Sequence, residues 1–307
     1  MSRAAILLAT YNGDKYIREL LNSLVRQTYQ DYVCYIHDDG SIDQTVTICQ
    51  EFCRRYPEHF ILLEYPGTGS AKTNFFSLMK HTDEDYIFLC DQDDFWLSSK
   101  MEKMMKCTEG ERESLLVYCD LKITDDKLNI ISDSFFAASD VHPEEINYKN
   151  ALVRGYIPGC AMMFSRTIAE RALQYQNAEH IKMHDWWLLL IALMIDARMV
   201  YIDEPLVLYR QHENNTVGIR DLTVGEKIKK NLGMLFTGTM KNEKKRKIES
   251  RRLQAKELYE CNVGIDEKKW FVKEFAEIGS KGKLNRILFY AQNFKNVRWI
   301  KWTLPWV

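Results

Sequence analysis

The sequence has few prolines, no closely spaced pair of cysteines of the Cys-x-x-Cys type and no long hydrophobic run. Its 307 residues include six prolines and eight cysteines, and none of the cysteines forms a Cys-x-x-Cys pair. Free, buried thiols are therefore favoured over disulfides or a zinc site. No window reaches the ~18 uninterrupted apolar residues of a membrane span, and the N-terminal apolar stretch is too short for a signal peptide. We expect a soluble, cytoplasmic protein.

The net charge is also small, at −1, but it is unevenly distributed. Residues 1–219 carry 21 Lys and Arg against 33 Asp and Glu, whereas residues 220–307 carry 21 against 10. No internal repeat is visible. The asymmetry predicts an acidic body over residues 1–218 and a basic, mainly helical region over residues 219–307.

Short apolar runs alternate with helical patterns along the acidic body. We expect strands in residues 4–10, 31–41, 60–66, 85–94, 115–125 and 155–165. We expect helices in residues 15–28, 43–57, with Asp43 as a cap, 73–82, 165–176 and 184–194. The strands are continuously apolar rather than alternating, which predicts an α/β fold with a mostly parallel sheet and helices on both faces.

Three polar clusters stand at the ends of these strands. They are Thr10-Tyr11-Asn12, Asp38-Asp39-Gly40-Ser41 and Asp91-Gln92-Asp93-Asp94. Ligands bind beyond the carboxyl ends of such strands, so we expect the clusters to line one crevice. An Asp-x-Asp suits Mg²⁺ or Mn²⁺ shared with substrate phosphates. A solvated acidic turn remains the alternative for the Asp-x-Asp cluster. The cluster at residues 38–41 is either a plain turn or a site whose carboxylate accepts hydrogen bonds from the edge of a nucleobase.

Two further segments carry candidate chemistry. "GTGSAKT" at residues 67–73 is not a P-loop, because Ala71 stands where glycine must precede the lysine. Lys72 is then either solvated or turned towards a diphosphate. Asp185 opens an apolar helix and is either a cap or a general base, and the positive helix end is expected to lower its pKa. The neighbouring Trp186-Trp187 pair is more typical of a core than of a ligand platform.

Taken together, these motifs resemble family 2 glycosyltransferases of the GT-A fold. The matching segments, in family order over residues 4–218, are "ILLATYNGDKYIRELLNSLVRQTYQDYVCYIHDDGSIDQT", "TNFFSLM", "DYIFLCDQDDFW", "GYIPGCAMMFS", "HDWWLLL" and "YRQHENNTVG". The variant "CDQDDFW", "HDWW", "YRQHENN" looks most like bacterial rhamnosyltransferases of surface polysaccharide synthesis. The resemblance implies an inverting hexosyltransferase that moves a sugar, rhamnose in that branch, from a dTDP- or UDP-linked donor to a saccharide or lipid-linked saccharide.

The resemblance also implies site residues. Asp185 is the catalytic base. The nucleotide is bound by Thr10, Tyr11, Asn12, Asp38, Asp39, Lys72, Asp91 and Gln92. The metal, Mn²⁺ or Mg²⁺, is held by Asp93 with Asp91 and His212. The acceptor or the diphosphate is contacted by Gly159, Cys160, His184, Trp186 and Arg210.

The basic region after residue 218 matches no motif of that family. It contains "KIKKN" at 227–231, "KNEKKRKIESRRLQAK" at 241–256, and Trp299, Trp302 and Trp306 among Lys and Arg. This mixture suits peripheral contact with anionic lipid at the inner face of the cell membrane. A solvated face packed on the acidic body, a homodimer interface and a nucleic-acid surface are alternatives, although the family resemblance implies no nucleic-acid partner.

Two other functions are compatible with parts of the sequence. A catalytically silent protein that binds a sugar nucleotide or a polysaccharide would not need the acids at positions 39, 91, 93 and 185. A nucleotidyltransferase also uses a parallel sheet and carboxylate-held Mg²⁺, but "ATYNGDKY" does not supply its glycine- and lysine-rich loop. Both stay as alternatives to the glycosyltransferase.

Overall fold

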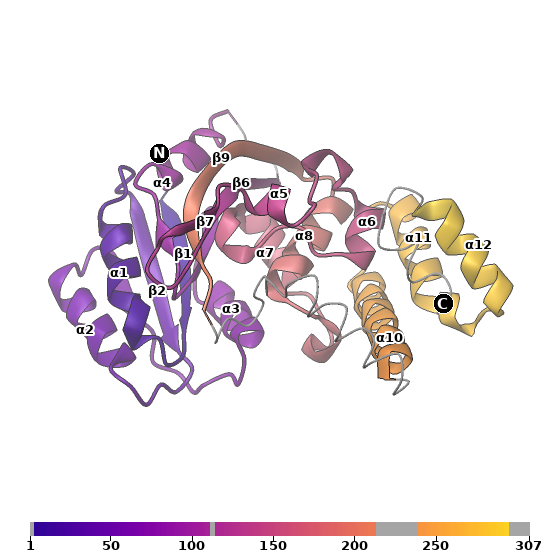
Figure 1. The fold of residues 1–307 in the computed structure, drawn as a ribbon, viewed down its shortest axis with the longest axis horizontal. Coiled ribbons are helices and arrows are strands. Elements are labelled where there is room, and N and C mark those ends of the chain that lie inside the picture. The colour runs from indigo at the N-terminus through magenta and orange to yellow at the C-terminus, as the bar shows by residue number, and fades with distance from the viewer. Residues whose placement is uncertain (1–2, 111–113, 213–238, 295–307) are drawn as a thin grey trace.

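The polypeptide folds around one mixed sheet (Figure 1), seen in a computed structural model that describes residues 3–110, 114–212 and 239–294. The strands are β1 (Ala4–Thr10), β2 (Tyr32–Asp38), β3 (Phe60–Leu62), β4 (Tyr86–Asp91), β5 (Phe95–Trp96), β6 (Leu115–Thr124), β7 (Ile130–Ser132), β8 (Met162–Ser165) and β9 (Arg198–Arg210). The helices are α1 (Asp14–Val25), α2 (Thr45–Arg55), α3 (Ala71–Lys80), α4 (Lys100–Lys106), α5 (Phe135–Ala138), α6 (Tyr148–Val153), α7 (Arg166–Ala172), α8 (His184–Met194), α10 (Thr239–Glu260), α11 (Asp266–Glu277) and α12 (Lys283–Asn293). Short 3₁₀ turns occur at Pro143–Glu145, Gly159–Ala161, Ala178–His180 and Ile278–Ser280.

The described strands form a nine-stranded sheet in the order β3-β2-β1-β4-β8-β6-β9-β5, with β7 paired to β6. The first four strands are parallel, and β6 and β9 are also parallel. By contrast, β8 runs antiparallel to both β4 and β6, and β5 runs antiparallel to β9. The expected mostly parallel α/β sheet is confirmed.

The chain order reverses at β1, which places a crevice at its carboxyl end. From β1 the chain builds β2 and β3 on one side and then returns to add β4 on the other. The register aligns Thr10 with Asp38 and Ala9 with Asp91. The three polar clusters therefore meet at one edge of the sheet, at the type of switch point where α/β proteins bind ligands.

Helices cover both faces of the sheet. In Figure 1, α1 and α2 lie together on one side, while α3, α7 and α8 lie on the other. Helix α1 buries Ile17, Leu20, Leu21 and Leu24 at helical spacing, whereas α8 is apolar nearly all round and is buried on most of its surface.

Several expected elements are shorter in the structure; for example, of residues 60–66 only Phe60–Leu62 is a strand. Of residues 155–165 only Met162–Ser165 is a strand, because a 3₁₀ turn follows Pro158, which cannot donate to a sheet ladder. The helix expected over 165–176 is confined to α7. Asp43 lies one residue before the N-cap of α2, and its Oδ1 accepts from the Thr45 backbone N–H at 2.9 Å.

The C-terminal region is helical, as expected. Helices α10, α11 and α12 share an apolar core that includes Val272, Phe275 and Phe289. Helix α10 also packs against α6 and the turn at Ala178–His180. The expected boundary at 218/219, the segment 227–231 and the three tryptophans after residue 294 lie outside the described residues. Among the helices that are described, none is both long and apolar enough to cross a bilayer. The eight cysteines are all free thiols.

Candidate active site

A large cleft opens at the carboxyl ends of β1, β2 and β4. Its volume is about 1870 Å³, which exceeds the ~300–1,000 Å³ of ordinary ligand pockets and leaves room for two substrates. The predicted site residues that line it are Thr10, Tyr11, Asn12, Asp39, Asp91, Gln92, Asp93, Gly159, His184, Asp185, Trp186 and His212. Among the predicted residues, Asp38, Lys72, Cys160 and Arg210 do not line it.

Asp38 organises a turn instead of facing the cleft. Its Oδ1 accepts from the backbone N–H of Gly40 at 3.0 Å and of Ser41 at 2.7 Å. Its Oδ2 accepts from the Thr10 hydroxyl at 2.8 Å. Both Asp38 oxygens are thus bound within the loops, where they support the site, and the nucleotide contact predicted for Asp38 stays a prediction.

Asp39 ties the end of β2 to the loop before α3. Its Oδ1 accepts from the Gly69 backbone N–H at 3.2 Å and from the Thr68 hydroxyl at 3.1 Å. Its own N–H donates to the Thr10 carbonyl at 2.9 Å. These bonds fix the Asp39 carboxylate in the wall of the cleft, half-buried.

Gln92 and Asn12 hold two further loops that line the cleft. The Gln92 carboxamide accepts from the Tyr11 N–H and donates to the Tyr11 carbonyl, each at 2.9 Å. A Cβ on Gly13 would lie 2.2 Å from Gln92 Oε1, so a larger residue there would displace the Gln92 carboxamide from these bonds. Asn12, at a positive φ of 47°, accepts from the Ile42 N–H at 2.9 Å. The Tyr11 ring is left 57% exposed and faces the cleft.

The Asp-x-Asp carboxylates lie at the floor of the cleft. Asp93 Oδ2 lies 2.7 Å from His212 Nε2, and the His212 ring stacks on Tyr16 with a centroid distance of 5.0 Å. Burial raises the pKa of Asp91 to about 7, and repulsion from Asp93 and Asp185 adds to this shift. Asp94, fully buried behind them, has its pKa raised by the same two causes, burial first and then Asp93.

A buried lysine that sequence reasoning missed stands beside this acidic cluster. Lys100 is fully buried, and its Nζ donates to the Cys160 carbonyl at 2.6 Å and lies 3.1 Å from the Trp96 ring centroid. Its positive charge lowers the pKa of Asp91, while burial lowers the pKa of Lys100 itself. A lysine at the start of a short helix gives no sequence signal of burial. It supplies a counter-charge that makes three close carboxylates tolerable.

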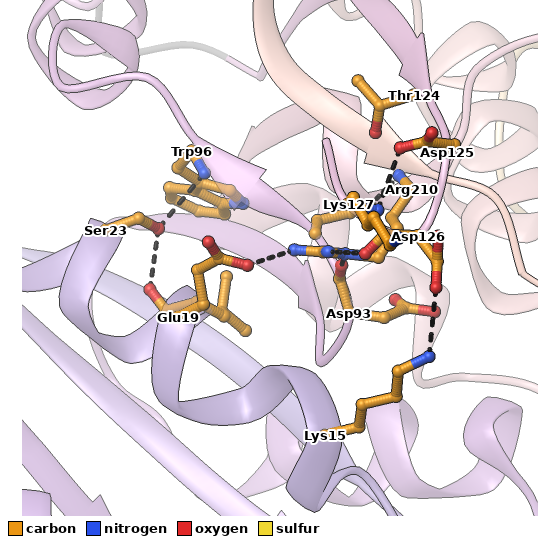
Figure 2. A network of polar contacts seen from close by, with 12 residues as sticks. Lys15, Glu19, Ser23, Asp93, Trp96, Thr124, Asp125, Asp126, Lys127 and Arg210 are labelled. Atoms are coloured by element: carbon orange, nitrogen blue, oxygen red, sulfur yellow. Dashed lines mark hydrogen bonds and ion pairs between the residues drawn. The ribbon is translucent and has the colours of Figure 1, made fainter. Parts of the chain in front are cut away.

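Arg210 hydrogen-bonds the backbone of the acidic loop after β4 and so fixes its position (Figure 2). Its side chain is 2% exposed; Nε donates to the Asp93 carbonyl at 2.8 Å, and Nη2 pairs with Glu19 at 2.5 Å. Nη1 donates to the Asp126 carbonyl, and the guanidinium lies 4.5 Å from the Tyr16 ring centroid. These partners hold the Arg210 guanidinium against the loops, and it does not line the cleft, so the diphosphate contact predicted for it stays a prediction.

The acidic residues fit a hard divalent cation. Ligand atoms of Asp91, Asp94 and Cys160 lie within 4.8 Å of one another, and Asp93 lines the cleft beside Asp91. Burial, with Asp94 next in importance, raises the pKa of the Cys160 thiol well above its usual range, so it stays protonated and is a poor ligand. The donors that remain are carboxylate oxygens, which suit Mg²⁺ or Mn²⁺.

Asp185 lies in the first turn of α8 and lines the cleft. Its Oδ1 accepts from the Trp186 N–H at 2.6 Å, and the backbone N–H groups of Trp186 and Gly159 act to lower the pKa of the carboxyl. Burial nevertheless raises the pKa of Asp185 to about 6. The expected lowering by the helix end is therefore wrong, since desolvation outweighs the dipole and the hydrogen bonds.

His184 and Gly159 pack beside this carboxylate. His184 is 3% exposed and stacks on Phe75 at 4.1 Å, and within the described chain neither ring nitrogen has a hydrogen-bond partner. Burial lowers the pKa of His184 to about 3, so the ring is neutral. A Cβ on Gly159 would lie 3.2 Å from His184 Nε2 and 3.6 Å from Asp185 Cβ. The absence of a side chain at 159 thus keeps the wall next to Asp185 open.

Cys160 and Trp186 differ in their access to the cleft. The Cys160 side chain is fully buried and does not line the cleft, and its predicted place at the acceptor stays a prediction. Trp186 lines the cleft, is 9% exposed, and donates from Nε1 to the Ala151 carbonyl at 2.6 Å.

The segment before Asp185 is held from two sides. Lys72, on α3, donates from Nζ to the carbonyls of Ala178 at 2.6 Å and Ile181 at 2.7 Å. Lys72 is therefore neither solvated nor among the residues that line the cleft, and the diphosphate contact predicted for it stays a prediction. From α10, the fully buried Glu257 accepts from the Asn177 N–H at 2.9 Å and lies 3.0 Å from His180 Nδ1.

A second α10 residue contacts the same segment. Gln254, which is 1% exposed, accepts from the Lys182 N–H at 2.8 Å. The C-terminal helices therefore fix the segment that leads into Asp185. The hydrophilic residues of α10 gave no sequence signal of this contact, because their partners lie more than 70 residues away.

Known proteins resemble this chain in both sequence and structure. A protein-family model, Glycosyl transferase family 2, matches residues 5–171. The dTDP-rhamnosyl transferase RfbG of Shigella flexneri is 32% identical over 233 residues, which cover 69% of this chain and 73% of that protein.

Two solved structures share the fold. Residues 1–349 of S. aureus TarS in complex with UDP-GlcNAc superpose with a TM-score of 0.59 at 16% identity, covering 97% of this chain and 76% of that chain. The mannosyltransferase PcManGT from Pyrobaculum calidifontis, in complex with GDP-Man and Mn²⁺, gives a TM-score of 0.55 at 12% identity, covering 95% and 75%. The GT-A-like architecture expected from the sequence is thereby confirmed.

The family model spans more than half of the chain, and the same stretch supplies most of the cleft floor. The rhamnosyl transferase extends the match to over two thirds of the chain. The chain therefore belongs to glycosyl transferase family 2 and is an enzyme that transfers a sugar from a nucleotide-sugar donor.

Proposed function

We propose that this enzyme is a metal-dependent, inverting glycosyltransferase that moves rhamnose from a dTDP-linked donor to a saccharide acceptor in surface polysaccharide synthesis. The observation that carries the proposal is that one cleft joins the Asp-x-Asp carboxylates to a carboxylate whose pKa is raised to about 6, Asp185. The choice of rhamnose and dTDP is supported by the 32% identity with the rhamnosyl transferase of Shigella flexneri.

The donor is proposed to bind over the carboxyl ends of β1, β2 and β4. The exposed Tyr11 ring offers a stacking surface for the base, and the fixed Asp39 carboxylate offers an acceptor for its N–H groups or for the ribose. Asp93 and Asp91 would hold Mn²⁺ or Mg²⁺ against the diphosphate, and we assign His212, predicted as a third ligand, the role of orienting the Asp93 carboxylate 2.7 Å away. When bound, the cation supplies Lewis-acid stabilisation of the negative charge that the leaving group develops.

Asp185 is proposed to act as the general base. It takes the proton from the acceptor hydroxyl while the hydroxyl oxygen attacks C1 of the donor sugar. The bond from C1 to the diphosphate oxygen breaks, the nucleoside diphosphate leaves, and a single displacement inverts C1. A positioned base contributes ~10²–10⁴-fold, and Asp185 is largely ionised at neutral pH because its pKa is about 6.

The acceptor is proposed to enter beside Trp186 and Gly159. The volume of the cleft and the open wall at Gly159 leave space for a saccharide next to Asp185. A lipid-linked saccharide would bring the enzyme to the inner face of the cell membrane as a peripheral protein. The basic C-terminal region supports such contact.

A nucleotide-release assay tests the proposal. The purified enzyme is incubated with Mn²⁺, a saccharide acceptor and, in separate reactions, dTDP-rhamnose, UDP-GlcNAc or GDP-mannose. We expect the release of dTDP from dTDP-rhamnose and a β-to-α or α-to-β change at C1 in the product. Release of pyrophosphate would indicate the alternative nucleotidyltransferase, and thermal stabilisation by the donors without turnover would indicate a silent binding protein.

A further inference from the structure

A second pocket lies among the C-terminal helices, away from the active-site cleft. It is formed by α10, the 3₁₀ turn at Ile278–Ser280 and α12, and has a volume of about 460 Å³. Its lining residues are Lys245, Arg246, Ile248, Glu249, Arg252, Ile278, Gly279, Arg286 and Tyr290. No residue lines both this pocket and the described cleft. We call it the C-terminal basic pocket.

The lining of the C-terminal basic pocket is strongly cationic. It contains four basic side chains and one acid, Glu249, which already pairs with Arg252 at 2.6 Å. Like charges gathered in a concave site repel one another and raise the local positive potential. The lining therefore lacks most of the negative charge that would balance it.

Two of the guanidinium groups converge on one glycine. A Cβ on Gly279 would lie 1.9 Å from Arg252 Nη1, so the guanidinium packs directly on the Gly279 backbone. Arg252 is oriented further by a bond from Nε to the Ala276 carbonyl at 3.0 Å. Arg286 Nη1 donates to the Gly279 carbonyl at 3.4 Å. Contact with Gly279 thus holds the two guanidinium groups, which are planar sets of hydrogen-bond donors, in the pocket lining.

A buried hydroxyl group in the lining has no partner. Tyr290 is 4% exposed, and no described atom hydrogen-bonds its hydroxyl. The Nε of Arg286 is likewise buried without a described partner. Burial raises the pKa of Tyr290 to about 12, so the hydroxyl keeps its proton and is available as a donor. A buried donor without an acceptor is unfavourable by ~1–3 kcal/mol, which a ligand oxygen would relieve.

We propose that the C-terminal basic pocket is a binding site for a phosphate group, with Arg252 and Arg286 as charged ligands and the Tyr290 hydroxyl as a neutral donor. Guanidinium groups bind phosphate oxygens with paired, charge-assisted hydrogen bonds. The pocket volume lies within the ~300–1,000 Å³ range of small-ligand sites. This inference does not depend on which sugar the cleft transfers. The phosphate belongs either to a soluble molecule or to the headgroup of an anionic lipid.

Binding measurements on the full chain test the proposal. The enzyme is titrated with inorganic phosphate, and separately with phosphatidylcholine vesicles with and without phosphatidylglycerol. EDTA is present throughout so that the metal-dependent cleft does not contribute. Binding to phosphate alone identifies a soluble ligand, and binding that requires phosphatidylglycerol identifies a lipid headgroup. Either result supports the proposal if the variants below behave as stated, whereas binding to neither probe overturns it.

Three variants assign any binding to the pocket. Tyr290→Phe removes only the hydroxyl, and Arg286→Gln removes one guanidinium. Each should weaken binding on the order of tenfold, the value of one hydrogen bond to a charged group. Lys256→Gln removes one exposed charge from the same helix outside the pocket and should change binding little. Equal losses in Lys256→Gln and Arg286→Gln, or unchanged binding in Tyr290→Phe, would refute a built site. Retained transferase activity shows that each variant is folded.

Discussion

His212 Nε2 lies 2.7 Å from Asp93 Oδ2, which joins the end of β9 to the acidic loop after β4. The two residues are 119 positions apart. His212 also stacks on Tyr16, so its ring is oriented from a second side. A partner that orients a carboxylate in this way controls how well that carboxylate can hold a cation.

We expect His212→Ala to weaken metal binding. Loss of such an orienting partner typically lowers metal affinity by roughly 10–100-fold. The measurement is the Mn²⁺ concentration for half-maximal transfer, which should rise by about that factor, with kcat at saturating Mn²⁺ changed less. His142→Ala, at a half-exposed surface histidine, is the matched control. An unchanged Mn²⁺ requirement in His212→Ala would show that His212 does not support Asp93.

We expect Asp185→Asn to abolish transfer while donor binding survives. The carboxamide has nearly the same shape but cannot accept the acceptor's proton, so kcat should fall by ~10²–10⁴-fold. Calorimetric titration with dTDP in the presence of Mn²⁺ should give a Kd close to that of the wild type. Asp133→Asn, at an acid that is 83% exposed, is the control. Normal turnover by Asp185→Asn would remove the base assignment.

The pH dependence of kcat/KM should report Asp185. Burial raises its pKa to about 6, and only the ionised form accepts a proton. Activity should therefore fall below about pH 6, by ~10-fold per unit at the lower end, rather than near pH 4, where an ordinary aspartate titrates. If kcat/KM stays constant from pH 7 down to pH 5, Asp185 is not a base whose pKa is raised by burial.

We expect Lys100→Met to weaken metal binding by the acidic residues of the cleft. Methionine fills a similar volume but removes the positive charge that lowers the pKa of Asp91. Asp91 should then keep its proton to higher pH, so the metal should bind less tightly and the Mn²⁺ requirement should rise most steeply below neutral pH. Lys103→Met, on the exposed side of the same helix, is the control. Equal behaviour of the two variants would show that Lys100 is only a packing residue.

We expect Glu257→Ala to slow catalysis while leaving donor binding nearly unchanged. It leaves backbone N–H groups of the segment before α8 without their acceptor, which should lower the free energy of unfolding by ~1–3 kcal/mol. The looser segment should misplace Asp185, so kcat should fall while KM for the donor stays nearly constant. Glu260→Ala, on the exposed side of α10, is the control. A fall in stability with unchanged kcat would limit Glu257 to a structural role.

The sequence by itself determined the elements and the edge of the sheet where the site lies. Continuous apolar runs predicted β1, β2 and β4, and the alternation with helices predicted their parallel order. That order brings Thr10 beside Asp38 and Ala9 beside Asp91, so the polar clusters had to meet. These features depend on local periodicity and chain connectivity, which a single sequence displays.

Only the tertiary structure decided which polar residues face the cleft and which support it. Arg210, Lys72 and Asp38 carry the chemistry expected of ligand-binding residues, yet each is committed to protein partners. The burial of Lys100 and the raised pKa of Asp185 likewise depend on atoms supplied by distant elements. The hydrogen bonds of Lys100 and Arg210 cross 60 and 117 positions, and residue type and spacing along the chain do not encode such contacts directly.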